Sequence, residues 1–320
     1  MANQSLDLDL APPPSGGARL AALRYRRRLR DLIEVARLHR PIGIWLLLWP
    51  VLWAVWIAGA SHPSPKVLVI FVLGTVAMRS AGCVINDLAD RNFDPFVKRT
   101  RDRPIASRRL APAEALAWFL VLIASALALV LQLDEKTIRM SLIGAALAMS
   151  YPFFKRFFPL PQFYLGVAFS WGVPMVFMAQ MGQIPRVAWI IFFAGIIWAA
   201  IYDTMYAMVD RDDDLKIGVK SSAIVFGDMD KVIIGFLQLL MLYTLYLVGT
   251  NMEFGYWYNM GLAGAAVFFA WQQWLIRDRK PAESFKGFLN NHYVGLSVFI
   301  GILLEYAFRP GELSLGTLAQ

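Results

Sequence analysis

The feature that most restricts the fold of this chain is a series of long apolar segments separated by short polar ones. A helix rises about 1.5 Å per residue, so about 20 apolar residues are needed to cross the ~30 Å hydrocarbon layer of a membrane. The segments are continuously apolar rather than alternating, which argues against membrane β-strands. With 58% hydrophobic and 17% charged residues, the chain is also too apolar for a water-soluble domain. The sequence therefore predicts an all-α polytopic membrane protein, a bundle of nine transmembrane helices.

The nine expected spans cover residues 42–60, 67–85, 112–132, 137–153, 162–182, 187–207, 231–250, 257–275 and 289–307. The fourth is the least regular of them, because Arg139 lies inside its start and Pro152 lies at its end.

The distribution of basic residues predicts how the bundle is oriented in the membrane. Lys and Arg accumulate in cytoplasmic loops. If the N-terminus is cytoplasmic, the N-terminal tail and the loops after spans 2, 4, 6 and 8 contain 25 of the 31 Lys and Arg. We therefore expect a cytoplasmic N-terminus and a C-terminus on the opposite side. A basic belt facing anionic lipid also explains the net charge of +8 without a nucleic-acid partner.

The ends of the chain differ in composition from the apolar segments. Residues 1–30 contain Pro, Gly and acidic residues but no apolar core of a signal peptide, and we expect them to form a disordered tail that ends in a basic stretch. Residues 31–310 are then the transmembrane domain, and residues 311–320 are a C-terminal tail. The chain has a single cysteine, Cys83, which excludes an intrachain disulfide, and its three histidines lack zinc-ligand spacing.

A cluster of acidic residues, "NDLADRNFD", lies at the expected cytoplasmic end of the second span. If the helix continues through the cluster, Asn86, Asp87, Asp90 and Asp94 share about a quarter of its surface. Arg79 lies two turns below, on the same face. One interpretation is a solvated helix end whose acids pair with the basic loop that follows. An arginine and four oxygen-bearing side chains on one face of a membrane helix are costly unless they are used, which favours a functional site.

A second acidic cluster, within "YDTMYAMVDRDDDLKIG", leaves the sixth span on the same side of the membrane. In a helix, Asp203, Asp210 and Asp214 form one stripe with Tyr206 beside it, whereas Asp212 points away and is expected to be solvated. Two acidic stripes that face a shared central cavity would repel each other. The sequence therefore predicts a cation between them, in a cavity that opens to the cytoplasm.

The types of ligand suggest which cation this is. Oxygen donors without His or Cys suit Mg²⁺, which bridges carboxylates to substrate phosphates. A diphosphate carried by Mg²⁺ would join the two clusters. The sequence contains no GxxxxGK[ST] phosphate loop, so it does not suggest a nucleotide hydrolase. Further cations expected at the same face are Lys155, Arg156, Arg99, Arg101, Arg103, Lys216 and Lys220.

The two clusters resemble the paired motifs of a known family. "NDLADRNFD" fits the NDxxDxxxD motif, and "DRDDD", Asp210 to Asp214, fits the DxxxD motif of the UbiA superfamily of intramembrane prenyltransferases. The flanks "RPIGIWLLLWP", "YPFFKR" and "VKSSAI" look like the branch that uses 4-hydroxybenzoate as the acceptor. The resemblance extends over residues 37–305. One departure is "IASRR", where Arg108 stands in place of an expected Gly, which puts the conformation of this loop in doubt.

The resemblance implies an enzyme of the bacterial inner membrane that acts in ubiquinone biosynthesis. It would transfer a polyprenyl chain from its diphosphate to the ring carbon ortho to the hydroxyl of 4-hydroxybenzoate, with Mg²⁺ stabilising the leaving diphosphate. Aromatic side chains would stabilise the allylic cation. The implied Mg²⁺ ligands are Asn86, Asp87, Asp90, Asp94, Asp210 and Asp214.

The remaining candidate residues concern the substrates. The carboxylate of the acceptor needs a guanidinium, for which Arg156 is the first choice and Arg79 the second. Lys155 is assigned to the diphosphate, with Arg99 and Lys216 as further substrate-binding cations. Asp203 and Tyr206 are candidates to polarise the phenol.

Two alternatives share part of this pattern. A prenyltransferase with another aromatic acceptor, such as a dihydroxynaphthoate, a homogentisate or a haem, would have the same metal ligands. An ion-coupled secondary transporter would also place acids in helices, but near the middle of the membrane rather than at one face.

Overall fold

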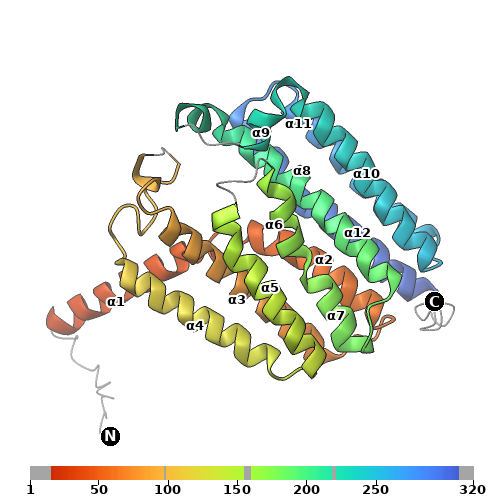
Figure 1. Ribbon diagram of the computed structural model, residues 1–320, viewed down its shortest axis with the longest axis horizontal. Helices are drawn as coiled ribbons and strands as arrows, with labels where there is room; N and C mark the ends of the chain where they lie inside the picture. The colour runs from red at the N-terminus through yellow and green to blue at the C-terminus, as the bar shows by residue number, and fades with distance from the viewer. Residues whose placement is uncertain (1–15, 97–98, 155–159, 218–220, 310–320) are drawn as a thin grey trace, which may run out of the picture.

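The structure is a computed structural model that describes residues 16–96, 99–154, 160–217 and 221–309. Figure 1 shows long helices side by side, with α1 extending away from the bundle at the N-terminal end. The longer helices are α1 (Gly16–Val35), α2 (Ile42–Ala58), α3 (Pro65–Ala89), α4 (Pro112–Val130), α5 (Glu135–Phe154), α6 (Pro161–Ser170), α7 (Gly172–Met181), α8 (Arg186–Ile217), α10 (Asp230–Asn251), α11 (Tyr256–Ile276) and α12 (Pro281–Phe308). Three short elements, η1 (Asp94–Phe96), α9 (Ser222–Val225) and η2 (Gly227–Met229), lie in the loops.

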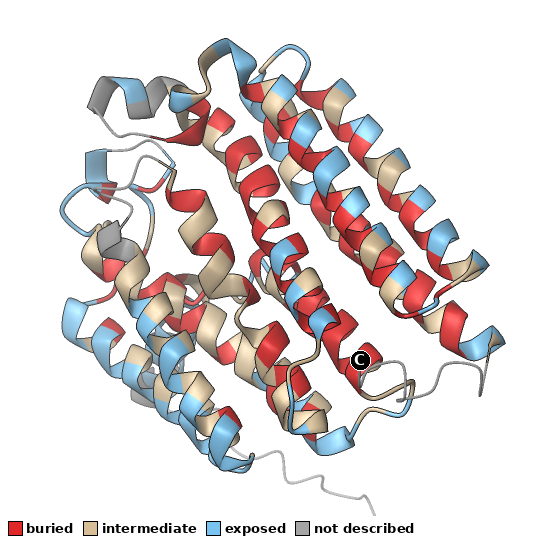
Figure 2. Ribbon diagram, turned by 45° about the vertical axis from the view of Figure 1, so that its right-hand side comes forward, coloured by how far each residue is buried: buried red, intermediate tan, exposed pale blue. Residues whose placement is uncertain are grey.

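The helices have the length and composition of a membrane protein. All nine segments expected from the sequence are helical. In the described part of the chain, six stretches are long and apolar enough to cross a membrane: α3, α4, α6 with α7, the first 26 residues of α8, η2 with α10, and α12; α2 is apolar but shorter. Helix α4 has a single buried residue, Ala115, and its apolar surface faces outward (Figure 2). Because such a surface is stable against lipid but not against water, the chain is an integral membrane protein.

Prolines set several helix boundaries. Helices α3, α4, α6 and α12 each begin with Pro at the first position, where the missing N–H would have no helical partner. The fifth expected span is divided into α6 and α7 at Trp171. Pro174 explains this break, because its ring crowds the carbonyl four residues earlier, at Ser170.

The main core joins α2, α8 and α12. The rings of Trp53 and Trp198 stack with centroids 5.5 Å apart. Each indole N–H donates to α12, Trp53 to the carbonyl of Gly295 and Trp198 to the side-chain oxygen of Asn291. A Cβ at Gly295 would lie 2.3 Å from a ring carbon of Trp49, so this helix crossing requires glycine. Buried indoles with satisfied N–H groups thus fix the three helices without leaving unpaired donors.

A second, smaller core lies where α1 meets the ends of α3 and α4. It contains Val35, Ala36, Val84, Leu88, Ile105, Leu110 and Ala115. For residues 16–30 the arrangement differs from the expected disordered tail, because they belong to helix α1; residues 1–15 lie outside the described structure.

Ion pairs attach α1 to the loop that precedes α4. Arg109 donates to the buried carboxylate of Asp31 at 2.5 Å and to both oxygens of Glu34, at 2.7 and 3.0 Å. The hydrogen bond from Arg109 holds the pKa of Glu34 below its ordinary value. Arg28 also reaches Glu114 at the start of α4. A basic segment whose composition predicts disorder is therefore held by an arginine of the loop before α4 and by an acid in the first turn of α4.

Candidate active site

A cavity of about 1660 Å³ extends from the acidic ends of α3 and α8 into the bundle. Its lining along α3 runs from Ile70 to Asp90, which is about 30 Å at the rise of a helix. One end is lined by charged residues, whereas deeper residues such as Leu47, Phe71 and Met175 are apolar. The cavity can therefore accept a long molecule with an anionic head and an apolar tail.

The first acidic motif lies where α3 ends. Asn86 is in the last turn, the helix ends at Ala89, and Asp90 is the C-terminal capping residue. Asp94 begins the short helix η1, so the continuous helix assumed from the sequence stops before it. Asn86, Asp90 and Asp94 nevertheless all line the cavity, because the turn after α3 carries Asp94 back toward the same space.

Asp87 is held by two arginines. It is 2% exposed, and Nη2 of Arg37 donates to both of its oxygens at 2.9 Å. Nη1 of Arg103 donates to Asp87 at 3.0 Å and to Asp94 at 2.9 Å. Arg103 therefore bridges two acids of the motif. The expected role of Asp87 as a Mg²⁺ ligand stays a prediction, and its contacts here are with guanidinium groups.

The second acidic motif lies in the last turns of α8, which continues through it as expected. Asp210 accepts hydrogen bonds from Nε and Nη2 of Arg99 at 2.7–3.1 Å. Nη1 of Arg99 donates to the hydroxyl of Tyr206 at 2.6 Å, and the guanidinium lies 5.0 Å from the centre of the Tyr206 ring. The loop after α3 is thereby attached to α8. We call this charged end of the cavity the mouth; it comprises Asn86, Asp87, Asp90, Asp94 and Asp210 with the arginines Arg37, Arg99 and Arg103.

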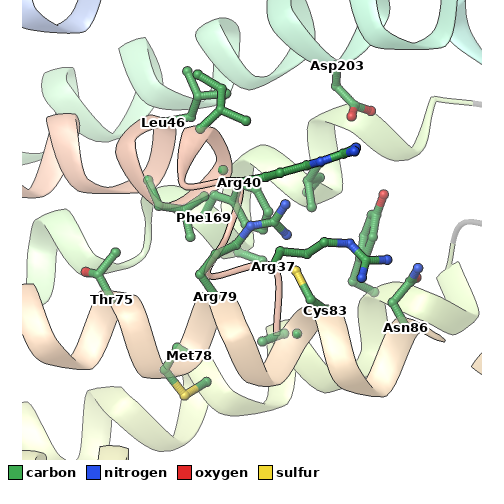
Figure 3. A pocket seen from close by; sticks show the side chains of 18 of the residues that line it. Arg37, Arg40, Leu46, Thr75, Met78, Arg79, Cys83, Asn86, Phe169 and Asp203 are labelled. Carbon is green, nitrogen blue, oxygen red and sulfur yellow. The ribbon is translucent and has the colours of Figure 1, made fainter. Parts of the chain in front are cut away.

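Further inside, Arg79 and Asp203 line the same cavity from α3 and α8. Figure 3 shows their side chains entering it from opposite sides. The guanidinium of Arg79 lies 5.6 Å from the centre of the Phe169 ring. Within the described part of the chain, neither Arg79 nor Asp203 has a hydrogen-bond or ion-pair partner. We call Arg79, Phe169 and Asp203 the inner site.

The donor chemistry of the mouth fits Mg²⁺. The side chains are an amide and carboxylates, which are hard oxygen ligands. Among the described residues no three acidic, His or Cys side chains converge as a metal site would require. Guanidinium groups occupy two of the carboxylates instead, since Arg103 contacts Asp94 and Arg99 contacts Asp210. The negative charges of Asp94 and Asp210 are thus compensated by arginines, at positions where a metal cation could compensate them instead.

Several predicted site residues lie outside the described structure. Lys155 and Arg156 fall in the segment between α5 and α6, and the side chains of Asp214 and Lys216 near the end of α8 are likewise not described. Their assignments to the diphosphate, the acceptor carboxylate and Mg²⁺ stay predictions.

Sequence reasoning missed the partners of Asp87. The sequence predicts Arg103 only as one of several loop cations without a specific contact, and no pattern in it indicates a role for Arg37. Arg37 precedes Asp87 by 50 residues and lies in the turn between α1 and α2 with a positive φ of 58°. No local pattern indicates such a long-range pair, so the fold was needed to find it.

Fold and site together define the class of the protein: an integral membrane protein whose helices enclose a cavity with an acidic mouth and an apolar interior. Comparison with known proteins is consistent with this class. The model of the UbiA prenyltransferase family matches residues 47–294, which is more than half of the chain. This chain belongs to the UbiA prenyltransferase family.

Individual relatives agree with the family. The chain is 53% identical over 286 residues to a 4-hydroxybenzoate octaprenyltransferase from Ectopseudomonas mendocina, an alignment that covers 89% of this chain and 97% of the relative. Among solved structures, a UbiA homolog from Aeropyrum pernix K1 has a TM-score of 0.71 at 21% identity, covering 82% of this chain and 97% of the homolog. A UbiA homolog from Archaeoglobus fulgidus bound to GPP and Mg²⁺ has a TM-score of 0.64 at 16% identity, covering 84% and 99%. The two structures have the same fold as this chain.

Proposed function

We propose that this protein is a 4-hydroxybenzoate octaprenyltransferase, which joins the prenyl chain of a polyprenyl diphosphate to the ring carbon ortho to the hydroxyl of 4-hydroxybenzoate. The observation that carries the proposal is the 53% identity to an enzyme of that name over 97% of its length. The cavity supports the proposal, because its charged mouth suits a metal-bound diphosphate and its long apolar interior suits a prenyl chain.

The mouth would bind the diphosphate. Asn86, Asp90, Asp94, Asp210 and Asp214 are the residues proposed to hold Mg²⁺, an ion present in a homologous structure that also contains a prenyl diphosphate. When bound, Mg²⁺ supplies charge stabilisation for the departing diphosphate. Arg99 and Arg103, which neutralise the acids in this structure, would then be available to the diphosphate oxygens.

The inner site would bind the acceptor. A planar guanidinium matches a carboxylate bidentately, and Arg79 has no acid partner in the described structure. We therefore place the carboxylate of 4-hydroxybenzoate at Arg79, which was the second choice from the sequence. Asp203 lies across the cavity and would accept a hydrogen bond from the phenol, raising the electron density of the ring. The C–C bond forms as the C–O bond to the diphosphate breaks, and the ring then loses its ortho proton.

The membrane arrangement proposed for this activity has nine transmembrane helices, with α6 and α7 forming one span. The basic loops after α3, α8 and α11 would lie at the cytoplasmic face of the bacterial inner membrane, together with the mouth. The C-terminus would lie on the other side. A cytoplasmic mouth gives direct access to water-soluble 4-hydroxybenzoate, while the prenyl chain stays in the apolar interior.

The test is a transfer assay on the purified protein in lipid. Ring-labelled 4-hydroxybenzoate, Mg²⁺ and octaprenyl diphosphate should give a lipid-soluble labelled product, with dihydroxynaphthoate and homogentisate as competing acceptors in parallel. Product from one of these acceptors, but none from 4-hydroxybenzoate, would contradict the proposal while leaving the family assignment intact.

A further inference from the structure

Gly43, in the first turn of α2, lies directly against the guanidinium of Arg79. It is buried and lines the cavity. A Cβ placed on Gly43 would lie 2.6 Å from Nε and 2.6 Å from Nη2 of Arg79, and 2.9 Å from Cζ. Non-bonded heavy atoms are at their optimum near 3.5–4.0 Å. A residue larger than glycine at position 43 would therefore displace the guanidinium by about 1 Å.

We infer that Gly43 is a positioning residue for the acceptor: the absence of a side chain there sets where the guanidinium of Arg79 stands in the cavity. The inference rests on the proposed role of Arg79 in binding the carboxylate. Two neutral neighbours flank the guanidinium: the ring of Phe169, whose centre is 5.6 Å away, and Gly43, whose missing Cβ leaves room for the guanidinium. Neither takes its N–H groups, which stay available to a carboxylate. The space left at Gly43 thus helps to set the position of the guanidinium, and no ion pair within the described structure occupies it.

A purely structural role for Gly43 predicts something different. Some glycines in this bundle are needed because two helices touch; a Cβ on Gly166, for example, would lie 2.8 Å from the backbone of Ile196. At Gly43 the three nearest atoms all belong to the end of the Arg79 side chain. A flexible side chain can move without moving a helix. Gly43→Ala is therefore expected to leave the fold intact and to shift Arg79.

The first experiment measures steady-state kinetics of Gly43→Ala in lipid, with each substrate varied in turn. The KM for 4-hydroxybenzoate should rise about tenfold, because a displacement of about 1 Å degrades a bidentate contact. The KM for octaprenyl diphosphate and the melting temperature should stay at the wild-type values. The matched control is Gly235→Ala on α10, where the added Cβ would have its nearest neighbour at an ordinary 3.5 Å, in the side chain of Gln273.

The second experiment asks whether the effect acts through the guanidinium. Arg79→Lys replaces the planar group with a compact ammonium, so adding Gly43→Ala to Arg79→Lys should change the acceptor KM less than twofold. The neutral analogue 4-hydroxybenzamide provides a second readout. Gly43→Ala should lower kcat/KM about tenfold for the acid but leave it unchanged for the amide, since a carboxylate-specific contact is weakened.

The outcomes separate this inference from the proposed function. If Gly43→Ala leaves the acceptor KM unchanged while Arg79→Lys raises it, the inference is overturned and the role of Arg79 stands. Equal losses for the acid and the amide, additive effects of the two substitutions, or a fall in melting temperature would also overturn it, because each indicates a packing role. If the wild-type protein does not prenylate 4-hydroxybenzoate, the proposed function fails first, and the inference with it.

Discussion

At the mouth of the cavity, Asp87, Asp94 and Asp210 contact arginines of the same chain, whereas Arg79 and Asp203 of the inner site have no such partners in the described structure. Both regions belong to α3 and α8 and share one cavity. Paired charges at the mouth stabilise the arrangement of loops and helices. An arginine inside a membrane protein that forms no ion pair with its own chain is best explained by a substrate that supplies the missing charge. The difference separates groups that serve the fold from groups that serve binding.

The largest expected effect concerns the acids of the mouth. Asp90→Ala and Asp210→Ala should each lower the transfer rate by orders of magnitude, and EDTA should abolish activity until Mg²⁺ is restored, because the departing diphosphate loses its compensating charge. The control is Asp228→Ala, since the Asp228 side chain is 97% exposed. Full activity of both variants, or activity in EDTA, would contradict the assignment of the mouth to a metal-bound diphosphate.

The second prediction tests the structural side of the comparison. Asp87→Ala removes the carboxylate that Arg37 and Arg103 share, leaving two partly buried guanidinium groups uncompensated. Unfolding free energy should fall by about 3 kcal/mol, measured by thermal or denaturant unfolding in detergent. Asp87→Asn, which keeps one acceptor oxygen, should lose less. Unchanged stability with lost Mg²⁺ dependence would instead return Asp87 to the metal ligands expected from the sequence.

A third prediction concerns the inner site. Arg79→Met should raise the KM for 4-hydroxybenzoate by about tenfold to a hundredfold, from about 1.5–3 kcal/mol of lost charge-assisted contact. Arg79 forms no ion pair in the described structure, so the melting temperature should stay near the wild-type value. Arg156→Lys is the comparison variant. If it alone raises the acceptor KM, the carboxylate belongs at Arg156, as first expected from the sequence.

The smallest expected effect lies in the loop that carries Arg99 and Arg103 of the mouth. Arg108 has a φ of 60°, a conformation that glycine adopts without strain. Arg108→Gly should therefore stabilise the protein by about 0.5 kcal/mol, the relief of strain being partly offset by a more flexible unfolded chain. Arg101→Gly, in the same loop but without a positive φ, should be neutral or destabilising. Loss of stability in Arg108→Gly would show that the side chain, rather than the backbone, determines this position.

The sequence predicted the helices well because a membrane helix needs a long apolar run that can be read locally. Its errors occur where distant residues or single prolines decide the structure. The composition of residues 16–30 predicts disorder rather than helix α1, because the buried contacts of its last turns come from residues around Arg109. The break at Trp171 follows from Pro174, a single residue within a run whose apolar composition predicts one continuous span.

The same distinction between local and long-range information applies to the candidate site. Helical spacing placed Arg79, Asn86 and Asp90 on one face, and all three line the cavity. Asp94 reaches the cavity through a turn rather than along a helix. Side-chain pairing was beyond the sequence, since Arg37 and Asp87 are 50 residues apart and Arg99 and Asp210 are 111 apart. The close approach of Gly43 to Arg79 likewise depends on how two helices cross.

The bond from Arg99 to Asp210 also has a consequence for the order in which the protein is made. A ribosome adds about 5–20 residues per second, so Arg99 is synthesised roughly 6–22 s before the carboxylate that it contacts. The loop after α3 thus already carries its positive charge when the end of α8 is produced. Synthesis from the N-terminus provides the cation first, and the later acid of the second motif completes a pair with a group already present in the nascent chain.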